Sequence, residues 1–193
     1  VEFLRKNGQA KAEKKAGRIA AEGLVRIAMD GDKKAAIVEV NSETDFVAKN
    51  ETFQAYVEAV AAQAVKSDAA DMDAFMAEPW IEDSSKTVKE ALVEKIAVIG
   101  ENLNIRRFQK ETVENGCIVS YIHGGGRIGV IVKAETDTVN DTVKEALTNI
   151  AMQVAALSPK YVSSADVSEE YKEHEKSILL AQAKNENPDK PDN

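Results

Sequence analysis

The sequence contains a single cysteine and no long apolar run. Cys117 alone excludes an intramolecular disulfide and a cysteine-rich zinc site, and such sparse cysteine usage suits a reducing, cytosolic compartment. No segment approaches the roughly 20 apolar residues of a membrane span, and none resembles a secretory signal. We therefore expect a soluble, cytoplasmic protein that has no membrane partner.

Basic residues are also few relative to acidic ones. The chain has 25 Lys and Arg against 33 Asp and Glu, so its formal net charge is −8. Binding to a nucleic-acid backbone requires concentrated positive charge, and only residues 1–18 are rich in it. The net negative charge therefore argues against a nucleic-acid partner. The alternative is a nucleic-acid-binding protein led by the arm from Arg5 to Arg18, and its affinity should fall steeply with salt.

The sequence also lacks the residue spacings that would bring catalytic groups together. His123 and His174 lie in different expected elements, and Cys117 falls in an apolar strand pattern. Residues 123–127 include three consecutive glycines, but this loop leads into a strand, whereas a phosphate-binding loop opens into a helix. The glycines are interpreted as allowing positive φ or the approach of another backbone. We expect no enzyme, no direct nucleotide binding, no metal and no cofactor.

What the sequence does contain is an internal repeat. Residues 38–45 (VEVNSETD) return as residues 130–137 (VIVKAETD), and the likeness resumes further on within two apolar helical patterns. The copies differ after the shared Glu-Thr-Asp, where one continues with Phe46 and the other with Thr138. We interpret the duplicated part as scaffold and the difference as function.

Hydrophobic periodicity and turn residues give the order of elements. Asp30-Gly31 between two β-rich runs is typical of a hairpin, Asn50 is a possible helix N-cap, and Gly100 is suited to end a helix. Trp80 is expected to fix a polar surface insertion in place. The expected elements are a hairpin (19–29 and 35–41), a helix from 50, the insertion (67–85), a helix (86–100), a strand (103–108), a second hairpin (117–122 and 128–134) and helices at 139–157 and about 168–184.

The two Glu-Thr-Asp turns leave two alternatives open. Asp45 and Asp137 could form a metal-dependent catalytic site if the repeat brought them to one cation beside a pocket. Both, however, are expected to stand immediately before a helix, where Thr44 or Asp45 would cap free N–H groups, and we favour capping. Phe46 also has two interpretations, because it lies seven residues before Phe53 and could extend the same buried stripe.

Six motifs follow one another along the chain: KKAG (14–17), AAEG (20–23), EVN (39–41), TDFVAK (44–49), IGENLNIRR (99–107) and HGGGRIG (123–129). In sequence and in order they resemble the motifs of the translation elongation factor Ts family. The resemblance implies a guanine nucleotide exchange factor that binds GDP-loaded elongation factor Tu. Such a factor promotes GDP release by disturbing the magnesium and phosphate site, without catalytic chemistry of its own.

The same resemblance implies an α+β fold of two related subdomains, in agreement with the repeat. Each is a small antiparallel sheet packed by helices, and a helical segment follows at the C-terminus. The implied boundaries are 18–114 and 115–193, with 1–17 as a basic helical remnant or linker from an N-terminal module. Since the sequence begins at Val1 inside an expected helix and ends in a turn-like segment, we expect truncation at both ends; the oligomeric state stays open.

By motif match, the resemblance also implies which residues meet the GTPase. Asp45 and Phe46 would lie near its magnesium and phosphate, with Phe46 wedged between two histidines of the partner. The segment from Ile99 to Asn102 would face the nucleotide-binding domain, and His123 would face the third domain. The implied partner-binding residues are Thr44, Asp45, Phe46, Val47, Ile99, Gly100, Asn102 and His123.

Overall fold

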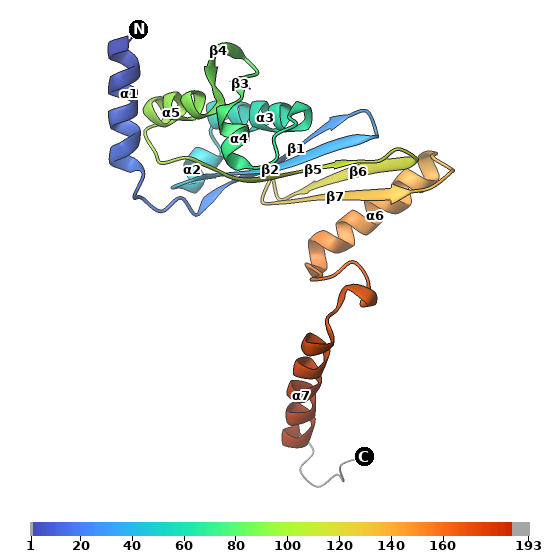
Figure 1. Ribbon diagram of the computed structural model, residues 1–193. Helices are drawn as coiled ribbons and strands as arrows, with labels where there is room; N and C mark the ends of the chain where they lie inside the picture. Colours follow the sequence, from blue (N-terminus) through green and yellow to red (C-terminus); the bar gives the residue numbers. More distant parts are fainter. Residues whose placement is uncertain (1, 187–193) are drawn as a thin grey trace. The chain divides into compact units, whose positions relative to one another are not determined.

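The computed structural model describes the backbone of residues 2–186 and the side chains of residues 8–186 (Figure 1). The chain divides into two compact units, Val1–Ala156 and Leu157–Asn193. The elements, in chain order, are α1 (Glu2–Lys15), β1 (Glu22–Asp30), β2 (Lys34–Ser42), α2 (Asp45–Ala48), α3 (Glu51–Lys66), α4 (Met72–Ala77), β3 (Pro79–Trp80), β4 (Asp83–Thr87), α5 (Val88–Ile99), β5 (Asn104–Thr112), β6 (Gly116–His123), β7 (Ile128–Glu135), α6 (Asp141–Leu157), a 3-10 turn (Ser164–Asp166) and α7 (Glu169–Glu186).

The expected α+β class is confirmed. Strands β1, β2 and β5 form an antiparallel sheet in the order β1-β2-β5, and β6 pairs with β7 in a separate hairpin. The repeat is visible in the element order, because hairpin β1–β2 precedes α2 and α3, whereas hairpin β6–β7 precedes α6. The boundaries proposed for the two subdomains stay a prediction.

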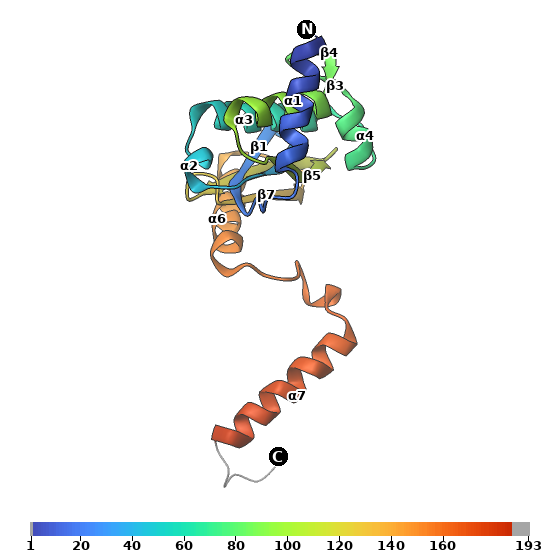
Figure 2. The same cartoon turned by 90° about the vertical axis from the view of Figure 1, so that its left-hand side faces the viewer.

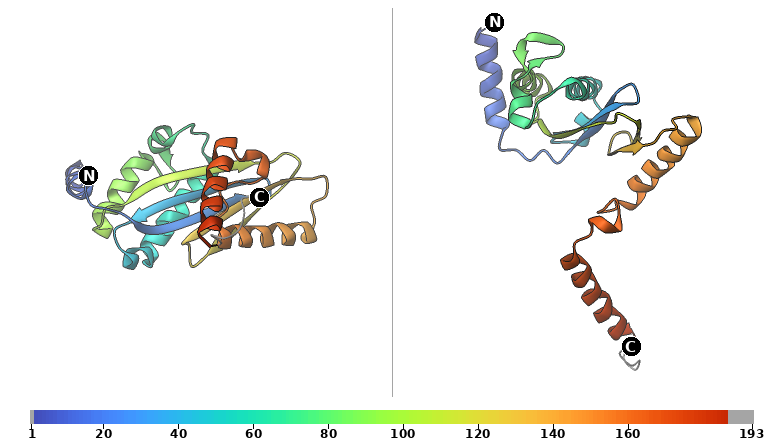
Figure 3. Two further views of the ribbon diagram at one scale, coloured as in Figure 1. Left: turned by 90° about the horizontal axis from the view of Figure 1, so that it is seen from below. Right: turned by 45° about the vertical axis from the view of Figure 1, so that its right-hand side comes forward.

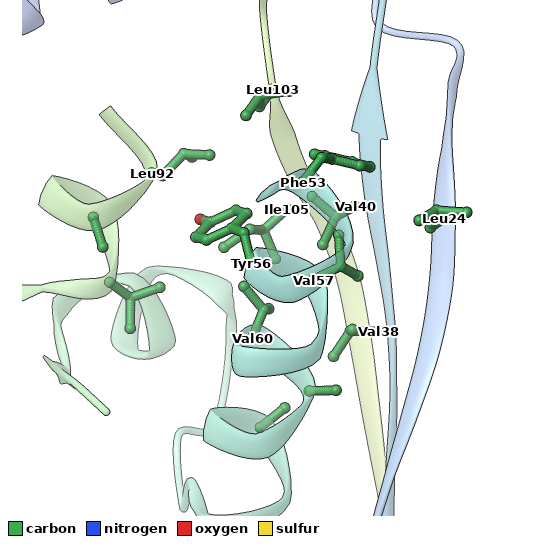
Figure 4. Packing of buried hydrophobic residues seen from close by; sticks show 14 of the residues in the cluster. Leu24, Val38, Val40, Phe53, Tyr56, Val57, Val60, Leu92, Leu103 and Ile105 are labelled. Carbon is green, nitrogen blue, oxygen red and sulfur yellow. The ribbon is translucent and has the colours of Figure 1, made fainter. Parts of the chain in front are cut away.

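The main core lies between the three-stranded sheet and α3 (Figure 4). Apolar residues of α3 recur every three or four positions, so Phe53, Val57 and Val60 share one face, and all three are fully buried. They pack with β2, whose residues Val38 and Val40 point to the same side of the sheet. Asn50 caps α3 as predicted, accepting hydrogen bonds from the backbone of the first turn.

Residues 67–85 differ from the expected surface insertion. They form α4 and the small β3–β4 hairpin, and Phe75 is fully buried in the main core. The apolar spacing of Met72, Phe75 and Met76 matches one helical face, but a six-residue helix is too short to give a clear periodicity. Trp80 is buried as predicted, with its ring 5.7 Å from that of Tyr56.

The second hairpin packs on the sheet face opposite α3. Side chains alternate along β2, so Ile37 points away from Val38. A Cβ built on Gly129 of β7 would lie 3.0 Å from Ile37 Cδ1. The backbone N–H of Ile118 also donates to the Asp32 carbonyl at 2.7 Å. Helices, sheet and hairpin are thus stacked in the first unit, and α6 follows β7 on the side away from α3 (Figure 3).

Helix α1 packs against α5 (Figure 2). A Cβ built on Gly8 would be in ordinary contact with Ala97 Cβ, at 3.8 Å, and Ala12 is buried. At the end of α1, the Lys15 ammonium donates to the Gly100 carbonyl at 2.7 Å. The helix expected in residues 1–17 is therefore present, and it packs on the first unit through Ala12 while most of its other described side chains are exposed.

The second unit is built around α7, in which no residue is buried. The Tyr161 and Tyr171 rings stand edge to face 5.5 Å apart, and Lys160 donates to the Tyr171 hydroxyl at 3.0 Å. Across residues 2–186, every helix is too short or too polar to cross a bilayer. The polar end segment noted in the sequence falls largely at 187–193, outside the described residues.

Candidate partner-binding site

Phe46 is presented to solvent by a helix of one turn. Thr44 has extended backbone angles (φ −125°, ψ 155°), and its hydroxyl accepts from the Val47 N–H at 3.4 Å, which makes it the N-cap of α2. Phe46 is 80% exposed, whereas Phe53 is fully buried. The buried-stripe interpretation of Phe46 is therefore wrong. Val47 is half-buried and packs against the main core, so it anchors α2 to the core.

Asp45 is paired with a lysine one turn further along. The Lys49 ammonium lies 2.7 Å from the Asp45 carboxylate and 6.0 Å from the centre of the Phe46 ring. The hydrogen bond from Lys49 lowers the pKa of Asp45 below its ordinary value, and the charges of Lys49 and Arg127 add to this effect. Asp45 is thus held as a carboxylate beside an exposed aromatic ring.

A second turn, residues 100–102, is bound directly to the turn before Phe46. Gly100 ends α5 in the left-handed conformation (φ +86°), as predicted from its position. The Glu101 carboxylate accepts from the N–H groups of Glu43 and Thr44 at 3.0 and 3.1 Å. It also accepts from the Thr44 hydroxyl at 2.6 Å. In return, the Asn102 N–H donates to the Glu43 carboxylate at 2.6 Å.

The segment after α1 joins the same cluster. Asn102 donates its side-chain amide to the Arg18 carbonyl at 2.7 Å, and the Arg18 guanidinium lies 3.7 Å from the Glu43 carboxylate. We call this set of five residues the junction; it consists of Arg18, Glu43, Thr44, Glu101 and Asn102. It joins three segments that are distant in sequence, immediately beside Phe46.

Exposed apolar side chains flank the junction. Ile19 follows Arg18 and is 84% exposed, and Val98, two residues before Gly100, is 74% exposed. Ile99 is half-buried and packs against the main core. Together with Phe46, these side chains present apolar surface next to charged groups, a composition typical of a protein-binding surface.

His123 is exposed at the end of β6, where the β6–β7 loop begins. Its Nδ1 lies 2.8 Å from the Tyr121 hydroxyl. The loop approaches β1, because the Val25 N–H donates to the Gly126 carbonyl at 2.7 Å and Arg26 donates to the Gly125 carbonyl at 3.3 Å. Gly124, Gly125 and Gly126 have φ of +59°, +70° and +109°, so the sequence interpretation of the glycines is confirmed. Through Arg127 the loop acts electrostatically on Asp45.

The geometry does not support a shared metal site on Asp45 and Asp137. Asp45 follows the end of β2, whereas Asp137 accepts from Asn115 at 2.5 Å, close to where Lys33, immediately before β2, donates to the Gly116 carbonyl. The two carboxylates are separated by about the length of β2, roughly 30 Å for nine residues. Among residues 2–186, no cluster of three or more His, Cys, Asp or Glu side chains could hold a metal.

Asp137 also departs from its expected position immediately before a helix. Helix α6 begins only at Asp141, and Asn140 accepts from the Val143 N–H at 2.9 Å in the manner of a cap. The hydroxyl of Thr136 instead accepts from the Thr138 N–H at 3.1 Å and forms a local turn. The second copy of the repeat therefore presents no counterpart of the Phe46 helix.

Sequence reasoning missed Glu43, Glu101 and Arg18 as members of the site. Glu101 and Glu43 lie within or beside motifs that were recognised. Each binds the backbone of the other's turn, and these hydrogen bonds require the end of α5 to lie beside the end of β2, which no local pattern predicts. The only indication in the sequence is an acidic residue directly after a helix-ending glycine, where a carboxylate gains nothing from the helix dipole.

Comparison with known proteins gives a consistent result. The family model described as "Elongation factor TS" matches residues 43–193. Elongation factor Ts of Clostridioides difficile is 50% identical over 96% of the chain, and that of Clostridium novyi is 48% identical over 96%. Elongation factor Ts of Trichlorobacter lovleyi is 46% identical over the whole chain. The chain spans 61–63% of the length of these curated relatives.

Proposed function

Because the chain belongs to the elongation factor Ts family, we propose that it binds elongation factor Tu and promotes GDP release from that GTPase during translation elongation in the cytoplasm. The observation that carries the proposal is Phe46, a fully apolar side chain that is 80% exposed on a braced one-turn helix. The other residues proposed to touch the GTPase are Thr44, Asp45, Val47, Ile99, Gly100, Asn102 and His123.

In this proposal Phe46 enters the GTPase beside its magnesium and phosphate site and disturbs the groups that hold the ion. Burying one phenylalanine side chain contributes about 1.5–3 kcal/mol. Accelerating release about a thousandfold requires roughly 4 kcal/mol. Phe46 alone is therefore insufficient, and the remainder must come from the magnesium shell and from contacts that are stronger with the nucleotide-free GTPase.

The proposed role needs no catalytic group, cofactor or bound nucleotide in this chain. GDP and the chain displace one another from the GTPase through a ternary complex, so all the work is done by differential binding. Val47 packs on the core and so gives Phe46 a rigid base. Asp45 places a negative charge against the partner surface, near the magnesium ion of the GTPase.

The nucleic-acid alternative rests on the basic arm, and two of its cations already have protein partners. Lys15 donates to the Gly100 carbonyl, and Arg18 lies 3.7 Å from the Glu43 carboxylate. These contacts favour the exchange role. Binding of the chain to RNA that weakens steeply with salt would support the alternative.

The experiment measures release of a fluorescent GDP analogue from elongation factor Tu with excess unlabelled GDP. We expect the wild-type chain to accelerate release and Phe46→Ala to remove most of the acceleration. Val162→Ala, which truncates an exposed apolar residue of the second unit, is the control and should behave as wild type. Equal acceleration by wild type and Phe46→Ala would refute the assigned role of Phe46.

A further inference from the structure

We propose that Glu101 is a positioning residue that holds the turn presenting Phe46 and so acts on nucleotide exchange through Phe46. This inference rests on the proposed function and adds a residue to it. Glu101 uses both carboxylate oxygens on this one turn: Oε2 accepts from two backbone N–H groups and Oε1 from the Thr44 hydroxyl. No other side chain in residues 8–186 makes three hydrogen bonds to the turn before α2.

The turn needs an external support because α2 is too short to hold itself. A helix of four residues has little intrinsic stability, since nucleating a helix costs more than its first hydrogen bonds return. The N–H groups of Glu43 and Thr44 lie before the helix and have no partner within it. A carboxylate is the strongest acceptor that a side chain offers to such groups.

Thr44 transmits this support to Phe46. Its hydroxyl donates to Glu101 Oε1 at 2.6 Å and, as N-cap, accepts from the Val47 N–H at 3.4 Å. Phe46 lies between the capping residue and the N–H that is capped. The carboxylate therefore fixes the rotamer of the cap, and the cap fixes the backbone that directs the Phe46 ring outward.

The arrangement is reciprocal, which distinguishes it from a chance surface contact. While Glu101 binds the backbone of residues 43 and 44, Glu43 binds the Asn102 N–H at 2.6 Å. The positive charge of Arg18, 3.7 Å from Glu43, offsets the two carboxylates. Each turn thus supplies a carboxylate to the other turn's backbone, and movement of one turn breaks contacts in both.

The first test follows the amides themselves, by hydrogen–deuterium exchange of the chain alone in NMR. In Glu101→Ala we expect the amides of Glu43 and Thr44 to exchange about tenfold faster, because the loss of charge-assisted acceptors leaves them to water. Glu101→Gln should keep most of the protection, since its side-chain oxygen can accept from both amides. Glu145→Ala, an exposed glutamate of α6, is the charge-matched control. Unchanged protection in Glu101→Ala would overturn the proposal.

The second test separates positioning from general stability with a double-mutant cycle on the rate of GDP release. Glu101→Ala should slow stimulated release about tenfold when Phe46 is present and less than twofold in the Phe46→Ala background. The same loss in both backgrounds would overturn action through Phe46. A wild-type chain that gives no acceleration would contradict the proposed function, while the amide exchange would still decide whether Glu101 holds the turn.

Discussion

Phe46 is a large apolar side chain that is exposed on a backbone held by its neighbours. An exposed phenylalanine gains nothing for folding, yet its backbone is capped by Thr44 and anchored through Val47. Because the backbone that carries the ring is already fixed, less backbone entropy is lost when a partner buries the ring. The proposed insertion of Phe46 into a partner would therefore start from a fixed backbone.

The pKa of Asp45 depends on Lys49, and this dependence is measurable. In Lys49→Met we expect the pKa of Asp45 to rise toward its ordinary value, because the hydrogen bond that lowers it is lost. A lowered folded pKa contributes stability above the ordinary pKa of aspartate, and that contribution disappears as pH falls through the lowered value. An NMR titration of the Asp45 carboxyl carbon checks this, and an unchanged pKa would exclude Lys49 as the cause.

Gly126 should tolerate substitution poorly. Its φ is +109°, and an added Cβ would lie 3.1 Å from the Val25 carbonyl oxygen and within the space of the Arg26 guanidinium. We expect Gly126→Ala to reduce the free energy of unfolding by about 1–3 kcal/mol in chemical denaturation. Gly17→Ala is the control, because nothing lies within 4 Å of its added Cβ and its φ is not positive, so it should be near neutral.

At the scale of elements, the helices that were predicted best are those with both an apolar stripe and a capping residue. Helix α3 has Asn50 and α5 has Gly100, and both residues act as expected. Prediction was less accurate where the pattern was short or the turn chemistry ambiguous. Helix α4 has only six residues, and Thr136 formed a local turn where Thr44 forms a cap. At such positions, competition between local turn types decides the backbone conformation.

Helix α6 is tied to the first hairpin by one described ion pair, Lys144 with Asp32 at 3.0 Å. Hydrogen bonding between them lowers the pKa of Asp32 and raises that of Lys144. The stabilising effect is complete between the two ordinary pKa values. It is lost as pH falls through the lowered value of Asp32 or rises through the raised value of Lys144.

Replacing Lys144 with Met should therefore loosen α6 selectively. We expect faster amide exchange in α6 at neutral pH, while amides of α3, which packs in the main core, keep their protection. Lys172→Met, which breaks an ion pair within α7, provides a control outside the first unit. If protection in α6 stayed the same, the ion pair would have no part in holding the helix.

For the molecule as a whole, local sequence patterns indicated Thr44, Asp45 and Phe46 as candidate site residues. They did not indicate the residues that hold this turn in place. The sequence indicates the repeat, the difference after its Glu-Thr-Asp turn and the family motifs. The junction joins three segments, to which Arg18, Glu43 and Glu101 belong, and such contacts depend on packing over long sequence separations. The capping of a turn by Thr44 depends on neighbouring residues in the sequence, whereas the support of that turn by the junction depends on tertiary contacts.

In the proposed function, the chain and GDP oppose each other's binding to the GTPase. Linkage requires that GDP weaken binding of the chain to elongation factor Tu by the same factor by which the chain weakens binding of GDP. Because Phe46 is proposed to supply part of this coupling, removing it should reduce the factor and leave some affinity from the remaining contacts.

The most direct test is therefore the dissociation constant of the chain for elongation factor Tu, measured by calorimetry with nucleotide-free and with GDP-saturated GTPase. We predict binding at least a hundredfold tighter without GDP, a coupling of about 3 kcal/mol, and a clearly smaller ratio for Phe46→Ala. Equal affinity for the two forms of the GTPase would contradict the account, because a protein that binds both forms equally cannot displace the nucleotide.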